Sequence, residues 1–310
     1  MTDPLPGRTE AGSPVGPWRR LVVRVWAQSA ARVGVVIIAL FIALAVFAPL
    51  ITAVIGSGPN DFHEGQIDKT LGGLPKGRLG GVSEDHWLGV EPVNGRDVLA
   101  RIVYGARISL LIAVLATAVS VIVGTVLGMV AGFFGGWIDT AISRLMDLVL
   151  SFPQLIFMIA LVAVLPDQGR TMSLILVIGF FGWPYIGRIV RGQTLSLRHR
   201  EFVEAAWAGG QLRGTILLRE ILPNLTSPIL VYATLSIPAN IGTEAALSFL
   251  GIGVQPPTPS WGQMMQKAMS WYQVDPMFFL VPGICLFLTV LGFTLFGDAL
   301  RDATDPKSGV

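Results

Sequence analysis

Residues 188–223 read RIVRGQTLSLRHREFVEAAWAGGQLRGTILLREILP and form a polar island between two long apolar runs. Small side chains in the island would admit a closely packed partner, and its Phe202, Trp207, Leu212 and Leu217 offer apolar area to bury. We therefore interpret the island as a docking surface for a soluble partner. The residues of its spaced motif are Glu204, Ala205, Ala206, Gly210, Ile221, Leu222 and Pro223.

The island is expected to fold as a short helix-turn-helix elbow. Residues 202–208 favour a helix, and Gly209 and Gly210 give the backbone freedom to turn where that helix ends. A second short helix is expected over residues 212–221. Pro223 suits the first turn of the next helix, because its missing N–H costs nothing there. Such an elbow would transmit force from a partner into the apolar runs on either side.

The whole chain is far more apolar than a soluble domain. Of its 310 residues, 52% are hydrophobic and 14% are charged, whereas about a quarter of residues are charged in soluble domains. We therefore expect an integral membrane protein. The net charge of +2 is too small to indicate a nucleic acid or an acidic partner. The single cysteine, Cys285, excludes an intramolecular disulfide and a thiolate metal cage.

Six apolar segments are long enough to cross a bilayer, which requires about 20 residues in a helix. The predicted fold class is therefore an all-α membrane protein with six transmembrane helices. In the second span, Gly124, Gly128 and Gly132 recur every four residues, and this stripe predicts close helix packing. Pro184 should bend the fourth span, because proline lacks the N–H of an unbroken helix. The spans are residues 33–55, 108–134, 148–165 (with an amphipathic lead-in from Trp137), 171–187, 221–243 and 276–297.

The placement of Lys and Arg predicts the orientation, because basic residues concentrate in cytoplasmic loops. With the N-terminus in the cytoplasm, thirteen basic residues lie inside and eight outside. Six of those eight belong to one long loop of mixed charge, residues 56–107, and long loops carry little weight in the rule. Both termini and the polar island are therefore expected in the cytoplasm.

Two segments between the spans are expected at the outer face. Residues 95–107 alternate charged and apolar residues at helical spacing, which indicates an amphipathic helix that leads into the second span or lies on the membrane surface before it. Residues 251–275 combine a proline run with Trp261, Trp271 and Tyr272, which suits a short element at the membrane interface.

The motifs of several catalytic classes are missing from the chain. No Gly-rich loop ends in Gly-Lys-Ser/Thr, so the chain does not bind ATP by that route. No Gly-x-Ser-x-Gly elbow is present, and His63-Glu64 lacks the second His of a zinc protease. We therefore expect a non-enzymatic chain with no catalytic residue, no metal site and no cofactor of its own.

Ionisable residues near the spans are few, although such residues are costly in a membrane and often functional. Arg144 and Asp147 are three residues apart and can pair on one helical face, and Asp139 precedes them. A structural pair is favoured for them over a role in translocation. Glu244, at the outer end of the fifth span, either contacts substrate or holds the bundle together, and the sequence does not decide between these roles.

The spaced motif of the island resembles the signature of the membrane subunits of binding-protein-dependent ABC importers. That signature is Glu-Ala-Ala, a Gly six residues after the Glu, and a later Ile-Leu-Pro, in a cytoplasmic loop between the fourth and fifth of six spans. Further matches extend from about Trp18 and are similar to the "C" subunit of the dipeptide, oligopeptide and nickel permease subfamily. They are HWLG (86–89), GRDVL (95–99), YGARISL (104–110), RLMD (144–147), FP (152–153), LSFLG (247–251) and QPPTPSWG (255–262). The chain departs from the pattern at residues 91–94 and at Gly209.

The resemblance implies a type I (MetI-like) importer fold, with one N-terminal helix and a five-helix core. It also implies a plasma-membrane permease that pairs with a second homologous permease, two ATPase subunits that use ATP and Mg, and an extracytoplasmic solute-binding protein. The motif residues would then couple the chain to the ATPases. Short peptides are the favoured substrate, nickel or another small solute is the alternative, and an ion-coupled secondary transporter is the competing class, disfavoured by the nearly uncharged midplanes.

The expected organisation places a cytoplasmic tail at residues 1–32, the first span at 33–55 and the outer loop at 56–107. The permease core follows at 108–298 and includes the coupling loop 188–223. A cytoplasmic tail ends the chain at 299–310.

Overall fold

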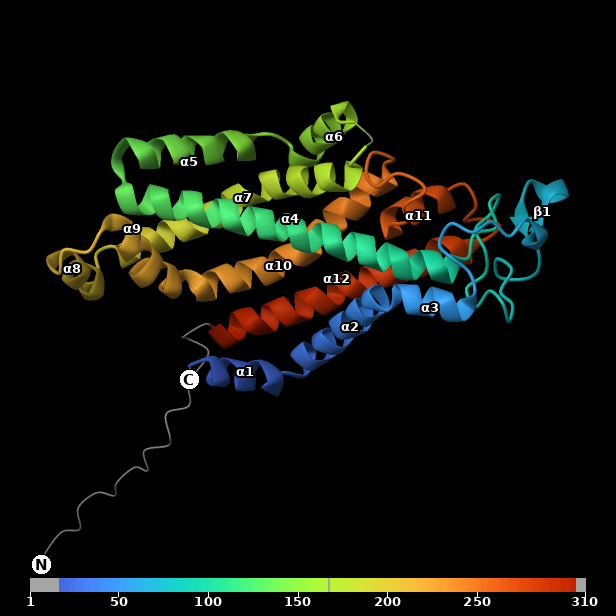
Figure 1. Ribbon diagram of the computed structural model, residues 1–310, viewed down its shortest axis with the longest axis horizontal. Helices are drawn as coiled ribbons and strands as arrows, with labels where there is room; N and C mark the ends of the chain where they lie inside the picture. Colours follow the sequence, from blue (N-terminus) through green and yellow to red (C-terminus); the bar gives the residue numbers. More distant parts are fainter. Residues whose placement is uncertain (1–16, 167, 305–310) are drawn as a thin grey trace, which may run out of the picture.

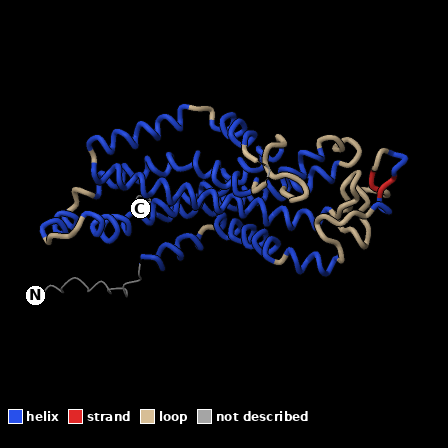
Figure 2. The backbone as a smooth tube through the Cα atoms, turned by 45° about the horizontal axis from the view of Figure 1, so that its top comes forward, coloured by secondary structure: helices blue, strands red, loops and turns tan. Residues whose placement is uncertain are grey.

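The computed structural model describes residues 17–166 and 168–304. Long helices lie side by side along one direction and form an elongated bundle (Figure 1). Helices α8 and α9 lie at one end of the bundle, and the short strands lie with the surrounding loops at the other (Figures 1 and 2). The polar island and the loop 56–97 therefore occupy opposite ends of the molecule.

Helices account for most of the described chain, and the only strands in residues 17–166 and 168–304 pair as a two-stranded antiparallel sheet. The elements are α1 (Pro17–Ala27), α2 (Ser29–Val46), α3 (Ala48–Ile55), η1 (Glu64–Gln66), β1 (Ile67–Asp68), η2 (Lys69–Leu71), β2 (Leu74–Pro75), α4 (Val98–Phe134), α5 (Gly136–Ser151), α6 (Gln154–Val164), α7 (Arg170–Leu197), α8 (Glu201–Ala208), α9 (Arg213–Thr215), η3 (Ile216–Ile221, π-helical), α10 (Leu222–Phe249), α11 (Trp261–Ala268) and α12 (Pro276–Thr304).

Five helical segments of the described chain are long and apolar enough to cross a membrane, and a sixth is present if α5 and α6 count as one span. The predicted all-α membrane fold is confirmed. Five of the six predicted spans coincide with α2–α3, α4, α7, α10 and α12.

The third predicted span, residues 148–165, is wrong as a single helix. The chain bends by 87° between α5 and α6. Phe152 has an extended backbone, with φ −85° and ψ 144°, because the ring of Pro153 disfavours the helical conformation of the residue before it. The span is therefore a broken pair of helices.

Helix α7 continues through Pro184 instead of ending there. Proline lacks an N–H, so the carbonyl of Phe180 loses its donor, and the ring disturbs the helical hydrogen bonds beside it. The carbonyl of Phe181 accepts from Gln154 Nε2 at 3.1 Å, and the carbonyl of Gly182 accepts from the Tyr232 hydroxyl at 3.2 Å. Side chains from α6 and α10 thus satisfy the backbone near the proline. The predicted bend at Pro184 stays a prediction.

The glycine stripe of α4 lies directly against α7, as predicted. A Cβ atom built on Gly124 would lie 2.6 Å from the carbonyl oxygen of Trp183. The corresponding distances are 2.6 Å from Gly128 to the carbonyl of Gly187 and 2.7 Å from Gly132 to that of Arg191. Any side chain at these positions would push the two helices apart.

The start of α4 differs from one of the two expectations for residues 95–107. Asp97 begins the helix, and its side chain accepts from the backbone N–H of Ala100 at 2.7 Å. From Val98 the helix runs without interruption to Phe134. The segment is thus the first turns of the span, and a separate surface helix is wrong.

A cluster of buried charges, which we call the charge cap, joins the loop 56–97 to α4 and α11. Glu91 pairs with Arg96, lies 3.8 Å from Nε of Arg101, and lies 3.6 Å from Nζ of Lys267. His86 Nδ1 lies 2.8 Å from a carboxylate oxygen of Asp97. Each of these residues except Lys267 is less than 5% exposed. The charge cap therefore fixes the loop end of the bundle.

Helix α11 was expected at the membrane interface, but it is part of the core. Trp261 is fully buried and packs edge-on against Phe41, with ring centroids 5.5 Å apart. Its indole N–H donates to the carbonyl of Ile102 at 3.1 Å. Trp261 is therefore a core residue, whereas Tyr272 is exposed. The interfacial position of this segment stays a prediction.

Candidate functional site

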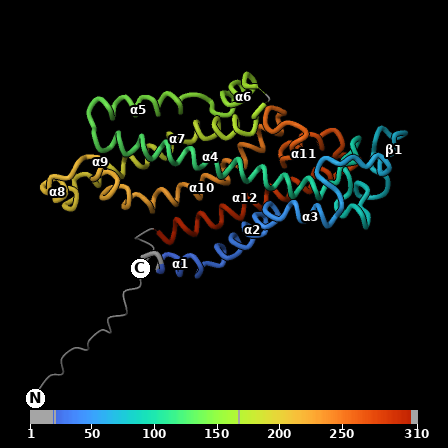
Figure 3. The backbone as a smooth tube through the Cα atoms, viewed as in Figure 1, coloured from blue at the N-terminus to red at the C-terminus, as the bar shows by residue number. Residues whose placement is uncertain are grey.

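Helix α8 projects at the far end of the bundle, beyond the ends of the neighbouring long helices (Figures 1 and 3). It spans Glu201–Ala208, close to the predicted 202–208. Arg200 precedes it in an extended conformation, and Glu201 and Glu204 lie in its first turn. Carboxylates there are favourable, because the helix dipole is positive at that end.

The inner face of α8 is anchored in the chain's own core. Val203 is fully buried and Ala206 is 6% exposed. They are three residues apart, so they lie on one face of the helix. Both pack in a cluster with Ile216, Ile221 and Leu225. Ala206 and Ile221, two residues of the predicted motif, therefore hold α8 in place.

Aromatic stacking ties α8 to the end of α4. The Trp207 ring stacks on Phe133, with centroids 6.0 Å apart and an interplanar angle of 7°. The guanidinium of Arg213 lies 6.0 Å from the Trp207 ring and 5.9 Å from the Phe134 ring, which is within the range of a cation–π interaction. Helix α8 therefore packs against the end of α4 as well as against the helical segment that leads into α10.

The turn after α8 depends on Gly210. Its φ of +73° lies in the left-handed region, which glycine adopts without a steric penalty. Its N–H donates to the carbonyl of Trp207 at 3.0 Å, and the N–H of Gln211 donates to that of Ala206 at 3.1 Å. Nothing in the described chain lies within 4 Å of a Cβ built on Gly210. The predicted glycine turn is confirmed, and open space surrounds it.

The predicted second short helix, residues 212–221, is wrong as a separate element. Residues 213–249 form one helical segment in which η3 is a π-helical turn. Pro223 has no N–H to donate to the preceding turn, and the wider π-helical turn accommodates its ring before α10 continues. The elbow is thus α8, a glycine turn and a direct continuation into α10.

The outer face of this elbow consists of exposed residues that share no contact with the chain's own core. We call it the docking face. It differs from the predicted motif in that Ala206 and Ile221 are internal and Glu201 is added. Its members are Glu201, Glu204, Ala205 and Gly210, all exposed, with Leu212 at 77% exposure on the rim. Leu222 is half-buried and Pro223 is exposed at the base of α10.

Two ion-pair groups link α5 to α7 near the docking face. Asp139 pairs with Arg191 through two hydrogen bonds, one of them 2.7 Å long, and both side chains are partly buried. Asp147 accepts from Arg188 at 2.7 Å and from Arg144 at 3.5 Å, and all three are largely exposed. The predicted pairing of Arg144 with Asp147 is confirmed, but the shorter bond is made by Arg188.

Glu244 is fully buried inside the bundle, in α10. Its two oxygens accept from the hydroxyls of Ser109 and Ser248 at 2.8 and 2.7 Å. Ser109 belongs to α4, so the carboxyl group links α4 to α10. Of the two roles left open for Glu244, this arrangement supports holding the bundle together.

A polar cavity of about 130 Å³ lies between α4, α6, α7 and α10. Gln154, Tyr232 and Asn240 line it and already bond across helices, Asn240 to the Thr117 hydroxyl at 2.8 Å. These residues are neutral, so they are not among the ionisable residues that the sequence indicated near the spans. An Asn or Gln inside an apolar run is the signal that would have found them.

Comparison with known proteins gives the family. The family described as the binding-protein-dependent transport system inner membrane component matches residues 124–310, which include the whole docking face. The chain belongs to this family. It is therefore a multi-pass inner membrane component of a transport system, and the resemblance seen in the island motif is confirmed.

Individual relatives agree over nearly the full chain. The dipeptide transport system permease protein DppC of Alkalihalophilus pseudofirmus is 42% identical, over 94% of this chain and 91% of its own length. The glutathione transport system permease protein GsiD of Shigella flexneri serotype 5b is 40% identical over the same shares. A solved inward-facing MetNI methionine ABC transporter has a TM-score of 0.50 at 20% identity, over 66% of this chain and 96% of that chain. The type I importer fold is thereby confirmed.

Proposed function

We propose that this chain is the translocation subunit of an ATP-driven importer of short peptides, and that its docking face receives a separate ATPase subunit. One observation carries the proposal. Helix α8 exposes Glu204 and Ala205, and the turn after it exposes Gly210, at the end of the bundle, while Val203 and Ala206 anchor the helix in the core. A rigid, protruding and unpartnered elbow is the feature expected of a surface that transmits force.

Membership of the family supports the partners that we propose for this machine. They are a second, homologous permease, two cytoplasmic ATPases that bind ATP and Mg, and an extracytoplasmic solute-binding protein. This chain itself binds no cofactor. Both of its termini and the docking face lie in the cytoplasm, in agreement with the excess of Arg around the island.

The mechanism is a shift between inward-facing and outward-facing arrangements. ATP-bound and nucleotide-free ATPases present different separations to the docking face. A partner can shift such an equilibrium only by binding the two arrangements differently. Helix α8 packs through Ile216 and Ile221 on η3, which continues into α10, and through Trp207 on α4. Displacement of α8 would therefore move helices that surround the polar cavity.

Short peptides are the substrate that the observations favour. Two similar proteins are named for dipeptides and for glutathione, which is itself a small peptide. The cavity between α6, α7 and α10 carries neutral donors and acceptors from Gln154, Tyr232, Ser236 and Asn240. Amide and hydroxyl groups of this kind can hydrogen-bond a peptide backbone without selecting a side-chain charge.

The docking face is tested by co-purification of the ATPase with the full-length chain after mild detergent extraction. Gly210→Arg should abolish the association, because a long charged side chain would project into the open space around the turn. Gly210→Ala is the matched control, since it introduces the same backbone strain at φ +73° without the bulk. Normal co-purification of a folded Gly210→Arg chain would defeat the docking assignment.

The substrate is tested separately, by uptake of a labelled dipeptide and of labelled glutathione into cells that express the complete transport system. We expect ATP-dependent uptake of at least one, and its loss with Gly210→Arg. If the ATPase binds normally and neither peptide is taken up, the importer assignment stands and the peptide assignment fails.

A further inference from the structure

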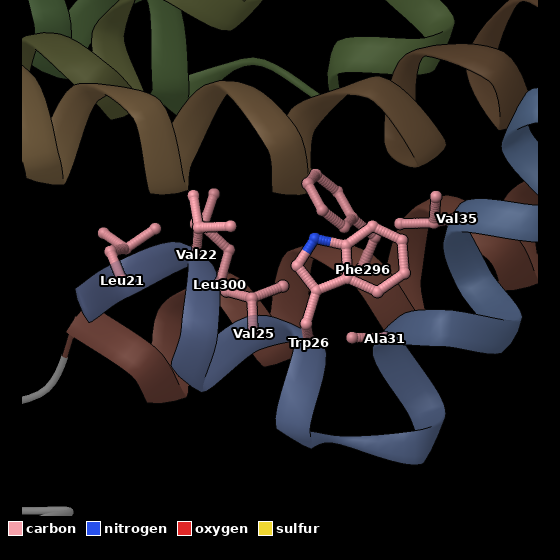
Figure 4. Close-up of a pocket in the computed structure, with 8 residues that line it drawn as sticks. All are labelled: Leu21, Val22, Val25, Trp26, Ala31, Val35, Phe296 and Leu300. Carbon is pink, nitrogen blue, oxygen red and sulfur yellow. The ribbon is translucent and has the colours of Figure 1, made fainter. Parts of the chain in front are cut away.

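An apolar groove lies in the angle between α1 and α2, with α12 as its floor (Figure 4). It has a volume of about 210 Å³. Leu21, Val22, Val25 and Trp26 line it from α1, and Figure 4 shows the Trp26 indole reaching toward Phe296 and Val35. Val22 is 50% exposed and Trp26 is 53% exposed. The described chain therefore leaves this apolar surface uncovered.

The groove lies at the height along the bundle where the apolar part of α2 begins and that of α12 ends. The apolar run of α2 starts after Arg32, and that of α12 ends at Gly297, before Asp298. The two helices meet at this level, because a Cβ built on Gly34 would lie 3.0 Å from the backbone nitrogen of Phe296. The groove thus opens where hydrocarbon gives way to lipid headgroups.

The charged residues of α1 and of the start of α2 are all positive. The chain carries no Asp or Glu between residues 11 and 60, whereas α1 and the start of α2 carry Arg19, Arg20, Arg24 and Arg32. Arg19 lies one turn before Val22 on the same side of α1, and Arg32 lies one turn before Val35 on α2. Arg19 and Arg32 are exposed and make no ion pair among the described residues.

The acidic residues of α12, Asp298 and Asp302, do not line the groove. Phe296 and Leu300 line the groove from one face, four residues apart. Asp298 lies two residues from each of them, which is about 200° around the helix at 3.6 residues per turn. Asp302 is also two residues beyond Leu300, although it lies one turn after Ala299, which packs in a cluster with Val25 of α1. The four arginines of α1 and the start of α2 outnumber the two aspartates of α12, so the net charge near the groove is positive.

We propose that this groove binds one anionic phospholipid from the leaflet at this end of the bundle. An acyl chain lies against Trp26 and Phe296, and the phosphate lies at the rim that Arg19 and Arg32 flank. An amphipathic, Arg-bearing helix next to a span attracts anionic lipid through its charge, and the apolar groove adds a defined place for the chain. The proposal is independent of the transported substrate.

The test uses brominated lipids, which quench tryptophan fluorescence on contact. The full-length chain is reconstituted in phosphatidylcholine vesicles that contain a minor fraction of either brominated phosphatidylglycerol or brominated phosphatidylcholine. The Trp26 signal is the difference between the native chain and Trp26→Phe. We expect phosphatidylglycerol to quench this signal several-fold more effectively. The double variant Arg19→Gln/Arg32→Gln should lose that preference, by roughly fivefold per arginine.

Two matched controls separate a site from general attraction. The first control, Arg24→Gln/Arg301→Gln, removes the same charge at the same end of the bundle. Arg24 lies about 200° around α1 from Val22 and Trp26. Arg301 lines a different cavity. This control should keep the preference. Val22→Phe should fill the groove and lower quenching by both lipids, whereas Val23→Phe, exposed but outside the groove, should not.

Equal quenching by the two brominated lipids in the native chain would overturn the proposal. Equal loss in the two double variants would also overturn it, because the preference would then reflect general attraction to the surface.

Discussion

The two ends of the bundle carry charges for opposite purposes. At one end, Glu204 of the docking face is exposed on a helix whose opposite side is anchored. At the other, Glu91, Arg96 and Arg101 of the charge cap are 1%, 4% and 0% exposed, and Glu91 forms ion pairs with both arginines. In sequence both regions look alike, as charged motifs beside apolar runs. The two regions differ in burial: the carboxylates of the docking face are exposed, whereas the charges of the charge cap lie inside the fold. Burial therefore separates the surface that we propose for docking from the one that stabilises the fold.

Within the charge cap, one anion is shared by three cations. Glu91 pairs with Arg96, Arg101 and Lys267, and burial lowers the pKa of Lys267 while the charge of Glu91 opposes that effect. Removing one partner of a buried ion pair is costly, because the other charge stays buried without compensation. The charge cap should therefore be the least tolerant polar region of the molecule.

Glu91→Gln is expected to have the largest effect. The substitution preserves the shape of the side chain but leaves three cations facing a neutral amide, and it should destabilise the folded chain by about 3–5 kcal/mol. Denaturant unfolding of the detergent-solubilised chain measures this. Glu64→Gln is the control, because Glu64 pairs with Lys69 at 2.6 Å but both side chains are about 70% exposed. If the two variants are equally stable, the charge cap does not hold the loop end of the bundle.

Val203→Ala tests the anchored side of the docking face and should have an intermediate effect. Val203 is fully buried, and deleting its methyl groups should loosen α8 by about 1–2 kcal/mol without unfolding the spans. Limited trypsin digestion reports this, since Arg198 and Arg200 flank α8.

Phe202→Ala is the matched control for Val203→Ala. It removes a larger side chain from the same helix, but Phe202 is 38% exposed. Faster cleavage for Phe202→Ala than for Val203→Ala would show that α8 is held by its outer face.

Asp275 at the loop end gives a pH-dependent prediction. It is 3% exposed, and its Oδ1 has no hydrogen-bond partner in the described chain. Burial raises the pKa of Asp275 above 3.8, and the backbone N–H groups of Phe278 and Met277 only partly offset this. The folded state therefore favours the protonated acid, so this group's contribution to stability is lost as pH rises from 3.8 through the folded pKa.

Asp275→Asn should remove that penalty, and the resulting gain in stability should be smaller than the losses expected for Glu91→Gln and Val203→Ala. The variant should unfold at a higher temperature than the native chain at neutral pH, and the difference should shrink as pH falls toward 3.8. Thermal unfolding at a series of pH values measures it. A constant difference across that range would mean that the Asp275 carboxyl does not titrate abnormally.

The helical bundle could be predicted from the sequence because apolar runs of membrane length have few alternatives. The errors occurred where local chemistry competes with that pattern. The apolar run 148–165 hides the break at Phe152-Pro153, whose bend comes from backbone sterics. Trp261 suggests an interface by composition, but its burial depends on α4 and Phe41, which are distant in sequence.

The sequence predicted where the candidate site lies in the chain, but it did not predict which of its residues face the core and which face outward. The glycine pair indicated the turn after α8, and the motif spacing indicated the coupling loop. The spacing of the motif residues did not indicate that Ala206 faces the core while Ala205 faces outward. The information lay in the apolar residues Val203 and Ala206, which are three residues apart and therefore share one face of the helix. The π-helical turn before Pro223 had no sequence signal other than the proline itself.

The smallest expected effect belongs to Arg144, at the docking-face end. Its side chain is 80% exposed and lies 3.5 Å from Asp147, which has a shorter bond of 2.7 Å to Arg188. Arg144→Gln should therefore change stability by at most about 0.5 kcal/mol, and Arg188→Gln by somewhat more but less than about 1 kcal/mol. Unfolding of both variants, together with peptide uptake, measures this. If Arg144→Gln keeps its stability and loses uptake, Arg144 acts on a partner or on the translocation path, and exposed charge at this end has a role beyond the docking face.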